Sequence, residues 1–463
     1  MNINIKDTDT EKYIEYVKLA ISGLNKQVYV LTFGCQQNEA DSEKILGITK
    51  LMGYSVTKNP ENADIIIVNT CAIRKHAEMK ALSTLGRFKV LKQKNPALII
   101  GVVGCMAAEP HIANMLKNDF HYITFTLQPN LIHKIPQLIW NNISDRKRSF
   151  IFNCDDGNIV EGIEQIREST HKAWVSVMYG CNNFCSYCIV PYVRGRERSR
   201  ESNEVIKECE ALVKHGYREI TLLGQNVNSY NSDMDFASLL ERIANIKGDF
   251  IIRFMTSHPK DVSDKLIKVI GQYKDKIAPS FHLPLQSGSD TVLKAMNRTY
   301  NTAKYIDTVK KIQSSVPEIA LTSDIIVGFP GESEDDFKCT LDMLSEIRFD
   351  MVYSFIYSKR EGTKAALMEN QIDDSVKSER MSRLLELQCK ISLEKNTEYV
   401  GKEVRVLVDS EKQQGGTKIY TARTLTNKLV HFESADTTVG EFTYVKITRA
   451  GDFELYGEKI ERA

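Results

Sequence analysis

Short apolar runs alternate with amphipathic stretches of helical period through residues 27–143. Each apolar run predicts a strand, at 28–33, 64–68, 98–103 and, more weakly, 122–126. Helices are predicted between them, at 39–52, 74–94 and 112–118. Continuously apolar strands that alternate with helices are typical of a parallel sheet covered on both faces. This part of the chain is therefore predicted to be a doubly wound, flavodoxin-like α/β domain.

The strand–helix pattern repeats about six times within residues 171–360. Repeated βα units predict a full or partial barrel, here a partial (β/α)6 barrel, with its chemistry on the loops that follow the strands. The predicted strands are 173–179, 219–223, 251–255, 280–283, 320–327 and 351–355. The predicted helices are 203–215, 236–246, 305–312, 334–347 and a charged amphipathic one at 375–396.

The segments that precede and follow these repeats have different sequence patterns. Residues 144–170 are polar and irregular and predict a linker, in which Cys154 has no partner motif. Residues 398–463 hold five short β-like runs separated by turn residues, which predict a small β-barrel of the oligonucleotide-binding kind. The five runs are 404–408, 418–421, 429–432, 442–447 and 453–456.

Composition and charge limit the cellular compartment and the partners that can be expected. The 463-residue chain carries a net charge of +1, so any nucleic-acid contact must come from local patches. No signal-peptide pattern stands at the N-terminus, and the longest apolar stretch, 97–108, is too short to cross a bilayer. We therefore expect a cytoplasmic protein with no membrane partner. In a reducing compartment, its ten cysteines indicate metal or redox chemistry rather than disulfides.

Cys181, Cys185 and Cys188 form a C-x3-C-x2-C run. Three thiolates cannot ligate all four corners of a [4Fe–4S] cube, so one iron stays open for a substrate or cofactor. The alternative is a zinc site with a remote fourth ligand. Structural zinc sites usually combine two short ligand spacings, and the sequence has no second pair. The run is therefore interpreted as an iron–sulfur site.

Cys35, Cys71 and Cys105 each lie just beyond the carboxyl end of a predicted strand. Ligands bind at that edge of open α/β sheets, so the three cysteines are predicted to converge and hold a second cluster. The alternative is that each is a small buried hydrophobic residue. That second interpretation is the one we give to the cysteines within helical patterns, Cys209, Cys339 and Cys389.

Two groups of basic residues predict RNA contacts. The run 194–200, beside the cysteine loop, forms a basic stripe that can grip phosphates, with a solvated loop as the alternative. Its arginines are Arg194, Arg196, Arg198 and Arg200. In the C-terminal segment, basic residues interleave with aromatic ones, although acidic residues balance the charge there. These residues are Lys418, Arg423, Lys428, Lys446 and Arg449 with Tyr420, Phe432 and Tyr444.

The order of these parts resembles the methylthiotransferase family of radical S-adenosylmethionine (SAM) enzymes, from about residue 27 to the end. Tyr187, directly before the third cysteine of the run, fits the radical SAM signature, and the tail resembles the family's TRAM domain. The resemblance is to the branch that acts on N6-isopentenyladenosine 37 of tRNA, and it is carried by runs 34–43, 179–191, 194–200, 223–230 and 282–290. It implies an auxiliary-cluster domain at 27–143, a linker at 144–170, a radical SAM domain at 171–397 and a TRAM domain at 398–463.

The resemblance implies two [4Fe–4S] clusters and SAM as cofactors. The cysteines of the C-x3-C-x2-C run would hold the cluster that cleaves SAM to a 5′-deoxyadenosyl radical, which abstracts hydrogen from adenosine C2. Cys35, Cys71 and Cys105 would hold the auxiliary cluster, which presents the sulfur that is methylated and transferred. Tyr187 and the loops after the barrel strands would contact SAM, since glycines permit close approach and amides supply hydrogen bonds. The loop residues are Gly224, Gln225, Asn226, Gln286, Ser287, Gly328 and Phe329.

The implied partners are the anticodon stem-loop of tRNA, an electron donor such as flavodoxin or ferredoxin, and a sulfur donor system. Bases of a single-stranded loop can be splayed out for modification. One alternative is the same chemistry on threonylcarbamoyl-adenosine 37 or on an aspartate of a ribosomal protein, against which the run 224–228 argues. Another is a non-catalytic iron–sulfur protein that binds RNA or regulates, which SAM cleavage under reducing conditions would exclude.

Overall fold

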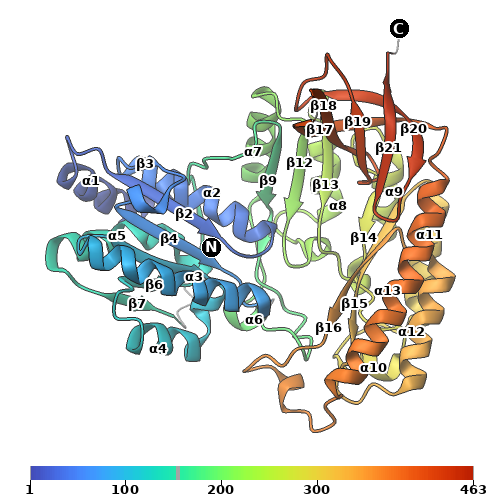
Figure 1. Cartoon of the computed structure of the whole chain (residues 1–463), viewed down its shortest axis with the longest axis horizontal. Coiled ribbons are helices and arrows are strands. Elements are labelled where there is room, and N and C mark those ends of the chain that lie inside the picture. Colours follow the sequence, from blue (N-terminus) through green and yellow to red (C-terminus); the bar gives the residue numbers. More distant parts are fainter. Residues whose placement is uncertain (1, 74, 153–156, 415, 462–463) are drawn as a thin grey trace. The chain divides into compact units, whose positions relative to one another are not determined.

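The computed structural model describes residues 2–73, 75–152, 157–414 and 416–461 and is drawn in Figure 1. Cys154 lies outside the described residues. The chain divides into two compact units. The first holds Met1–Glu168, Trp174–Phe184 and Cys188–Val205, and the second holds Ser169–Ala173, Cys185–Tyr187 and Ile206–Ala463. None of the helices in the described ranges is long and apolar enough to cross a membrane.

A six-stranded parallel sheet, in the order β3-β2-β4-β5-β6-β7, forms the centre of the first unit. Numbered from β2, this is the 2-1-3-4-5 order of flavodoxin-like folds with one strand added, as predicted. The two central strands, β4 and β5, are buried at every residue because helices cover both faces. The strands are β2 (Gln27–Thr32), β3 (Ser55–Val56), β4 (Ile65–Thr70), β5 (Ile99–Gly104), β6 (Phe125–Leu127) and β7 (Ser149–Ile151).

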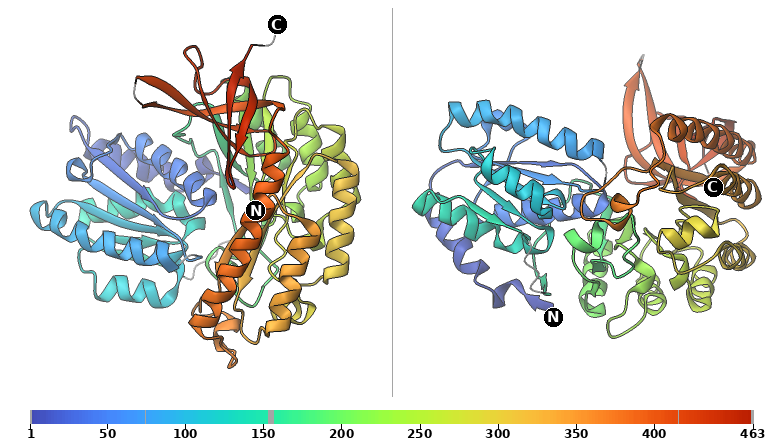
Figure 2. Two further views of the ribbon diagram at one scale, coloured as in Figure 1. Left: turned by 45° about the vertical axis from the view of Figure 1, so that its right-hand side comes forward. Right: turned by 90° about the horizontal axis from the view of Figure 1, so that it is seen from below.

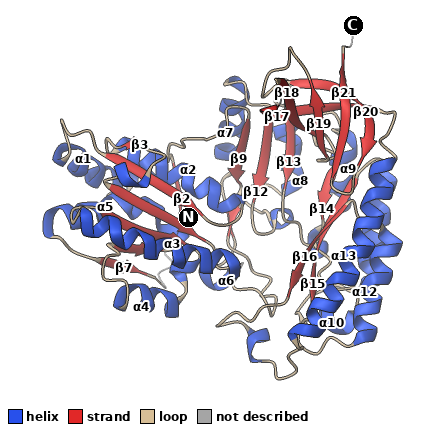
Figure 3. Ribbon diagram, in the orientation of Figure 1, coloured by secondary structure: helices blue, strands red, loops and turns tan. Residues whose placement is uncertain are grey.

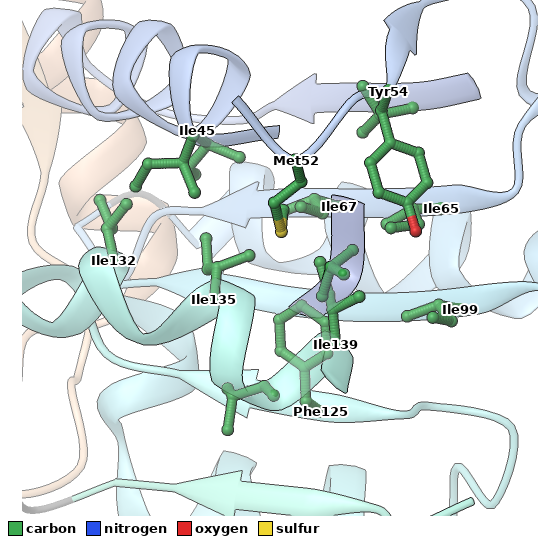
Figure 4. Close-up of a cluster of buried hydrophobic side chains, with 14 of the residues drawn as sticks. Ile45, Met52, Tyr54, Ile65, Ile67, Ile99, Phe125, Ile132, Ile135 and Ile139 are labelled. Carbon is green, nitrogen blue, oxygen red and sulfur yellow. The ribbon is translucent and has the colours of Figure 1, made fainter. Parts of the chain in front are cut away.

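Helices pack on both faces of this sheet, as Figures 2 and 3 show. On one face α1, α2 and α5 bury isoleucine-rich stripes against β4 and β5, in the cluster drawn in Figure 4. On the other face α3 and α4 bury a second apolar cluster. The helices are α1 (Thr10–Ala20), α2 (Gln36–Leu51), α3 (Lys75–Lys94), α4 (Pro110–Asn118) and α5 (Ile135–Asp145).

Several short elements complete the first unit. β1 (Asn2–Asn4) pairs in parallel with β8 (Ile159–Glu161), and β10 (Met178–Tyr179) pairs antiparallel with β11 (Arg198–Ser199). α6 (Val190–Val193) follows the cysteine run. The predicted linker is not wholly irregular, because it supplies both β7 and β8. Each of these strands has three residues, which is too few for a periodic pattern to reveal.

The second unit contains the strand–helix repeats. β12 (Glu219–Leu223) and β13 (Ile251–Phe254) are parallel neighbours, and the first residues of β9 (Lys172–Ser176) precede them in the same sheet. β14 (Ser280–His282), β15 (Ala320–Val327) and β16 (Met351–Ile356) form a second parallel sheet. A parallel bridge from Ile252 to Ile277 links the two sheets in chain order. These strands and their helices are the predicted mixed α/β arrangement.

Side-chain caps fix where several of the helices begin. Asp235 caps α8 by accepting from the Ser238 amide, and Ser333 and Asp336 form a reciprocal capping box at α12. The sequence analysis missed α9 and α10, as it missed α1 and α5 in the first unit. The helices are α7 (Ser202–Lys214), α8 (Phe236–Ala244), α9 (Asp264–Gln272), α10 (Asp290–Ala295), α11 (Thr302–Ser315), α12 (Glu334–Ile347) and α13 (Asp374–Thr397).

The C-terminal strands close into a barrel in the order β17-β18-β19-β21-β20, which confirms the predicted small β-barrel. Tyr420 and Phe432 stack inside it, with ring centroids 5.7 Å apart. Both rings are almost wholly buried, so they belong to the barrel core and not to the RNA surface that was predicted for them. The strands are β17 (Glu403–Gln414), β18 (Thr417–Thr424), β19 (Leu429–Glu433), β20 (Phe442–Ala450) and β21 (Glu454–Ile460).

Candidate metal centres and ligand loops

The first unit brings Cys35, Cys71 and Cys105 to one edge of its sheet. Cys71 and Cys105 directly follow β4 and β5, and Cys35 is the residue before α2, just after β2. These three strands are adjacent in the sheet. The sequence analysis therefore placed the three cysteines at the correct strand ends.

Two glycines allow the strand ends to approach closely. A Cβ atom on Gly34 would lie 2.9 Å from the Asn38 side chain and 3.1 Å from the Cys71 Cβ. Gly104 has a φ of +97°, which L side chains rarely adopt, and a Cβ there would meet the Thr70 carbonyl. The glycines before Cys35 and Cys105 are thus required by the geometry of this edge.

A hydrogen-bonded network of amides holds the same edge together. Asn38, on α2, donates to Asn69 Oδ1 and to the Thr70 carbonyl, both at 3.0 Å. Asn69 donates in return to the Asn38 carbonyl at 2.8 Å and to Ser42 Oγ at 2.9 Å. Both asparagines are buried. The network fixes the start of α2 against the end of β4, which positions two of the three cysteines.

Each of the three sulfur atoms has a polar neighbour. Cys35 Sγ lies 3.3 Å from Asn38 Oδ1, and Cys71 Sγ accepts from the Ile73 amide at 3.3 Å. Cys105 Sγ accepts from Arg194 Nε at 3.1 Å. The neighbours of Cys71 and Cys105 are N–H donors, which stabilise thiolate ligands and tune the metal that they hold, whereas the Cys35 thiol itself donates to Asn38. The donor set is therefore compatible with a cluster bound through sulfur.

The surroundings of Cys105 shift the pKa of its thiol upward. Its pKa rises to about 12 because it is buried; the Arg194 guanidinium opposes the rise, while Cys71 and Cys35 add to it. Metal binding at such a site displaces the proton, since the ligand is the thiolate.

In the described residues, no three His, Cys, Asp or Glu side chains converge closely enough to hold a single metal ion. A four-iron cube binds each cysteine through a different iron atom. Its ligands therefore surround a volume and do not meet at a point.

The cysteines of the C-x3-C-x2-C run fall in both units. Cys181 and Cys188 belong to the first unit, where the Cys181 amide donates to the Gly195 carbonyl at 3.2 Å. Cys185 belongs to the second unit, where Arg298 Nη1 lies 3.5 Å from its Sγ. Arg298 is buried and also donates to the Pro284 carbonyl at 2.9 Å. This arginine was not predicted from the sequence.

The loop after β12 carries polar groups suited to a ligand. Within the described residues, Gln225 Oε1 and Asn228 Nδ2 are buried without a hydrogen-bond partner. A buried polar group left in this state costs roughly 1–3 kcal/mol, so a ligand that satisfies it would bind there favourably. Asn226 is instead engaged, because its Nδ2 donates to Asp261 at 2.6 Å and its Oδ1 accepts from the His258 amide.

The other predicted SAM loops are built differently from one another. Gln286 has a φ of +73°, and its backbone bonds to both Asp324 and Ile326 of β15. Ser287 is wholly buried beside Thr340, at 3.5 Å between the hydroxyl oxygens. The Gly328 amide donates to Glu332 at 2.9 Å.

Phe329 is not exposed to a ligand in this structure. Its exposed fraction is 0%, and it lies in a cluster with Val292, Met296 and Tyr357, against which Tyr187 packs. Phe329 thus belongs to an apolar cluster that supports these loops, and the SAM contact predicted for Phe329 and Ser287 stays a prediction. Tyr187 connects the cysteine loop to this apolar support.

The basic run 194–200 does not form one exposed stripe. Arg194 is buried against Asp41, and Arg200 is buried in a two-pronged pair with Glu161, with N–O distances of 2.7 and 2.8 Å. Neither guanidinium is available to a phosphate here. Arg196 is exposed and stacks over the Phe184 ring, 4.4 Å from its centroid, while Arg198 is half-buried.

The basic residues predicted on the barrel are more accessible. Lys418 and Lys446 are exposed, and Arg423 is half-buried. Lys418 lies 3.3 Å from Glu411, and Arg423 lies 3.3 Å from Asp409. Lys428 is buried against Asp350 at 3.0 Å and is not part of this surface. Among the helices, Cys209 is buried as predicted, whereas Cys389 is only half-buried and Cys339 is exposed, so Cys339 is not a packing residue.

Three family models match the chain. The radical SAM superfamily matches residues 175–344, an uncharacterized protein family designated UPF0004 matches residues 27–126, and the TRAM domain matches residues 397–460. In solved structures, the chain is similar to the radical S-adenosylmethionine methyltransferase TsrM from Kitasatospora setae. The TM-score is 0.55 at 11% identity, covering 74% of this chain and 75% of that one. That likeness shows the fold alone.

Curated relatives match over almost the whole chain. The tRNA-2-methylthio-N(6)-dimethylallyladenosine synthase of Thermoanaerobacter pseudethanolicus is 47% identical over 97% of this chain and 96% of its own length. The synthase of the same name from Clostridium perfringens is 48% identical over 95% of this chain and 99% of its own length. The chain therefore belongs to the family of tRNA-2-methylthio-N(6)-dimethylallyladenosine synthases, which are radical SAM enzymes.

Proposed function

We propose that this enzyme methylthiolates C2 of N6-isopentenyladenosine at position 37 of tRNA, giving 2-methylthio-N6-isopentenyladenosine. The observation that carries the proposal is the convergence of Cys35, Cys71 and Cys105 at the carboxyl edge of one sheet, in addition to the C-x3-C-x2-C run. An enzyme that only cleaved SAM would need the run alone. The near half identity to curated synthases supports the choice of substrate.

The two cysteine sets have separate roles in this proposal. Cys181, Cys185 and Cys188 hold one [4Fe–4S] cluster, and Cys35, Cys71 and Cys105 hold the other. When bound, the clusters and SAM supply one-electron cleavage of SAM, hydrogen abstraction from adenosine C2, and the sulfur and methyl group that are transferred. The domains are proposed at 27–143, 171–397 and 398–463, with residues 144–170 between the first two.

The chain's own residues position SAM and RNA. Gln225 supplies a buried oxygen that can accept a hydrogen bond from SAM. The backbone of Gly224, Gln286 and Gly328 lines the strand ends, with Asn226 holding its loop in place through Asp261. On the barrel, exposed Lys418 and Lys446 are proposed to contact RNA phosphates, as is Arg196 in the first unit.

The reaction needs further partners. Reductive cleavage of SAM needs a one-electron donor, for which a flavodoxin or ferredoxin is suited, and repeated turnover needs a sulfur donor system. We place the reaction in the cytoplasm, where tRNA and such donors are found.

The test is a nucleoside assay on the reconstituted protein. Anaerobic enzyme is incubated with SAM, a reductant and tRNA bearing isopentenyladenosine 37, and digested nucleosides are analysed by mass spectrometry. A methylthio-shifted isopentenyladenosine is the expected product. If 5′-deoxyadenosine forms without that product, the substrate proposal is wrong; if neither forms in a protein that holds iron, the radical SAM reaction itself is wrong.

Two cysteine variants separate the roles of the clusters. Cys185→Ala is expected to abolish SAM cleavage, whereas Cys71→Ala keeps some cleavage but stops methylthio transfer. Cys339→Ser is the matched control, because Cys339 is an exposed cysteine outside both sets and its loss should leave both products unchanged. Methylthio transfer by Cys71→Ala would show that the auxiliary-cluster assignment is wrong.

A further inference from the structure

Arg194 makes a direct contact with a proposed cluster ligand. Its Nε donates to Cys105 Sγ at 3.1 Å, and its Nη2 donates to Asp41 Oδ2 at 2.9 Å and lies 3.5 Å from Asn38 Oδ1. Its side chain is 4% exposed, and that of Asp41 is 5% exposed. A guanidinium held this deeply requires its partners, since an unpaired buried charge is strongly unfavourable. Arg194 is therefore a fixed cation directed at one sulfur.

The planar fork of arginine suits this task. One edge reaches the sulfur and another reaches the carboxylate of Asp41, so the two contacts constrain each other. A lysine would present a single charged point and could not span both partners in the same way. Asp41 is held in turn by Gln37 Nε2 at 3.3 Å, on the same helix. The contact between Arg194 and Cys105 is therefore part of a buried hydrogen-bond network.

The segment that supplies Arg194 is anchored beside the same edge. Ile189, directly before α6, and Val193, its last residue, pack with Ala72, Cys105 and Ala108 in a small buried cluster. Cys188 lies six positions before Arg194 in the sequence. One short stretch of chain therefore carries a ligand of the proposed SAM cluster and the cation beside a ligand of the proposed auxiliary cluster.

We propose that Arg194 is a positioning residue of the auxiliary cluster, which holds Cys105 in its ligating orientation and raises the reduction potential of the cluster through its charge and its hydrogen bond to sulfur. This inference rests on the proposed function, in which Cys35, Cys71 and Cys105 bind that cluster. Hydrogen bonds to the sulfurs and net charge are the main protein controls on such potentials. Reduction adds one negative charge, and a nearby cation in a region of low dielectric stabilises it.

The charge of Asp41 acts in the opposite direction. Its carboxylate pairs with Nη2 while Nε faces the sulfur, so it partly cancels the field of Arg194 at the cluster. Removing the two charges separately should therefore shift the potential in opposite directions. A purely structural role for the pair would move both variants in the same direction, through loss of packing.

The experiment measures the auxiliary cluster by itself. In the full-length chain, Cys181, Cys185 and Cys188 are replaced by alanine, the protein is reconstituted anaerobically, and iron and sulfide are counted. The midpoint potential is then determined by redox titration with electron paramagnetic resonance, without tRNA. If this background holds no four-iron cluster, the auxiliary-cluster assignment has failed, which is distinct from failure of the role given to Arg194.

Arg194→Gln is expected to lower the equilibrium constant for one-electron reduction about tenfold or more, which is about 59 mV. Arg194→Lys, which keeps the charge, should lie nearer to the unsubstituted background, and Asp41→Asn should raise the potential. Arg200→Gln is the matched control, because Arg200 is equally buried in a carboxylate pair but contacts Glu161 and the Ser176 carbonyl. The midpoint potential of the auxiliary cluster should not change in Arg200→Gln.

Two results would overturn the proposal. One is an unchanged potential in a fully loaded Arg194→Gln protein. The other, which decides the matter if Arg194→Gln fails to load, is an unchanged or lowered potential in Asp41→Asn.

Discussion

Substitution of Gly104 by alanine should selectively loosen the edge where the N-terminal cysteines meet. The added Cβ would meet the Thr70 carbonyl oxygen and would lie 2.5 Å from Asn69 Oδ1. Neither atom is the end of a flexible side chain, because Thr70 O is backbone and Asn69 is held by its own hydrogen bonds. The Cys105 amide donates to the same Thr70 oxygen at 2.9 Å, so relief of the clash breaks that bond.

The size of the effect follows from two contributions. A left-handed backbone costs a residue with a Cβ about 1–2 kcal/mol. Overpacking of a close contact adds about 1–3 kcal/mol. The sum, roughly 2–5 kcal/mol, corresponds to about a 30-fold or greater loss of protection, since 1.4 kcal/mol is about tenfold. The amides at the end of β5 should show this loss of protection, because local opening there relieves the clash at the lowest free-energy cost.

Hydrogen exchange followed by mass spectrometry on peptides spanning β5 is the direct assay, with iron content after reconstitution as a second readout. The matched control is Gly86→Ala on α3. Gly86 has no atom within 4 Å of an added Cβ and no positive φ, so this change should stabilise the helix by about 0.5–1 kcal/mol. Wild-type protection of β5 in Gly104→Ala would refute the steric reasoning.

Three further predictions concern the second unit. Because of His258, the second unit should become less stable as the pH falls from 7 to 4. Burial, followed by the charges of Arg298 and Lys260, lowers the pKa of the His258 imidazole to about 2. In an unfolded chain the pKa of histidine is about 6.5. Between these two pKa values only the unfolded chain takes up the proton, so the free energy of unfolding falls by at most about 1.4 kcal/mol per pH unit. His258→Asn keeps an acceptor for the Lys260 amide and should reduce this dependence of the unfolding free energy on pH, as measured by urea titrations at each pH. Arg298→Gln should lower the potential of the SAM cluster, measured by redox titration in a chain without the N-terminal cysteines; an unchanged potential would show that the 3.5 Å contact has no influence. Lys418→Ala and Lys446→Ala should each reduce the slope of log affinity for tRNA against log salt by about 0.7–0.9, and an unchanged slope in fluorescence anisotropy would remove that lysine from the interface.

The fold was largely readable because its strands are unusual in composition. β5 is apolar throughout and β4 is apolar up to Asn69, and β12 and β15 begin and end where strands were predicted. Some of the missed elements are too short for a periodic pattern, such as β7, but α1, α5 and α9 have apolar faces that the sequence analysis overlooked. Spacing placed Cys35, Cys71 and Cys105 correctly, because parallel strands carry their following residues to a common edge.

The sequence was a poor guide to which arginines are exposed. Arg194, Arg196, Arg198 and Arg200 look alike along the chain, yet two are buried with carboxylates that lie far away in sequence. Asp41 stands 153 residues from Arg194, and Glu161 stands 39 residues from Arg200. No local pattern encodes such pairs. The burial of Tyr420 was missed for a related reason, since an aromatic ring in a small barrel is as much core as surface.

The two cysteine sets differ in the order in which they can be assembled. The ligands of the C-x3-C-x2-C run lie within eight residues and can meet in a chain that has little other structure. Cys35, Cys71 and Cys105 are separated by 36 and 34 residues, and they meet only once β2, β4 and β5 have paired. A cluster bound there closes two long loops at once, which restricts the unfolded chain much as a pair of cross-links would. Occupancy of the auxiliary site should therefore report that the N-terminal sheet is folded, and loss of its iron should be followed by a loss of stability confined to that sheet.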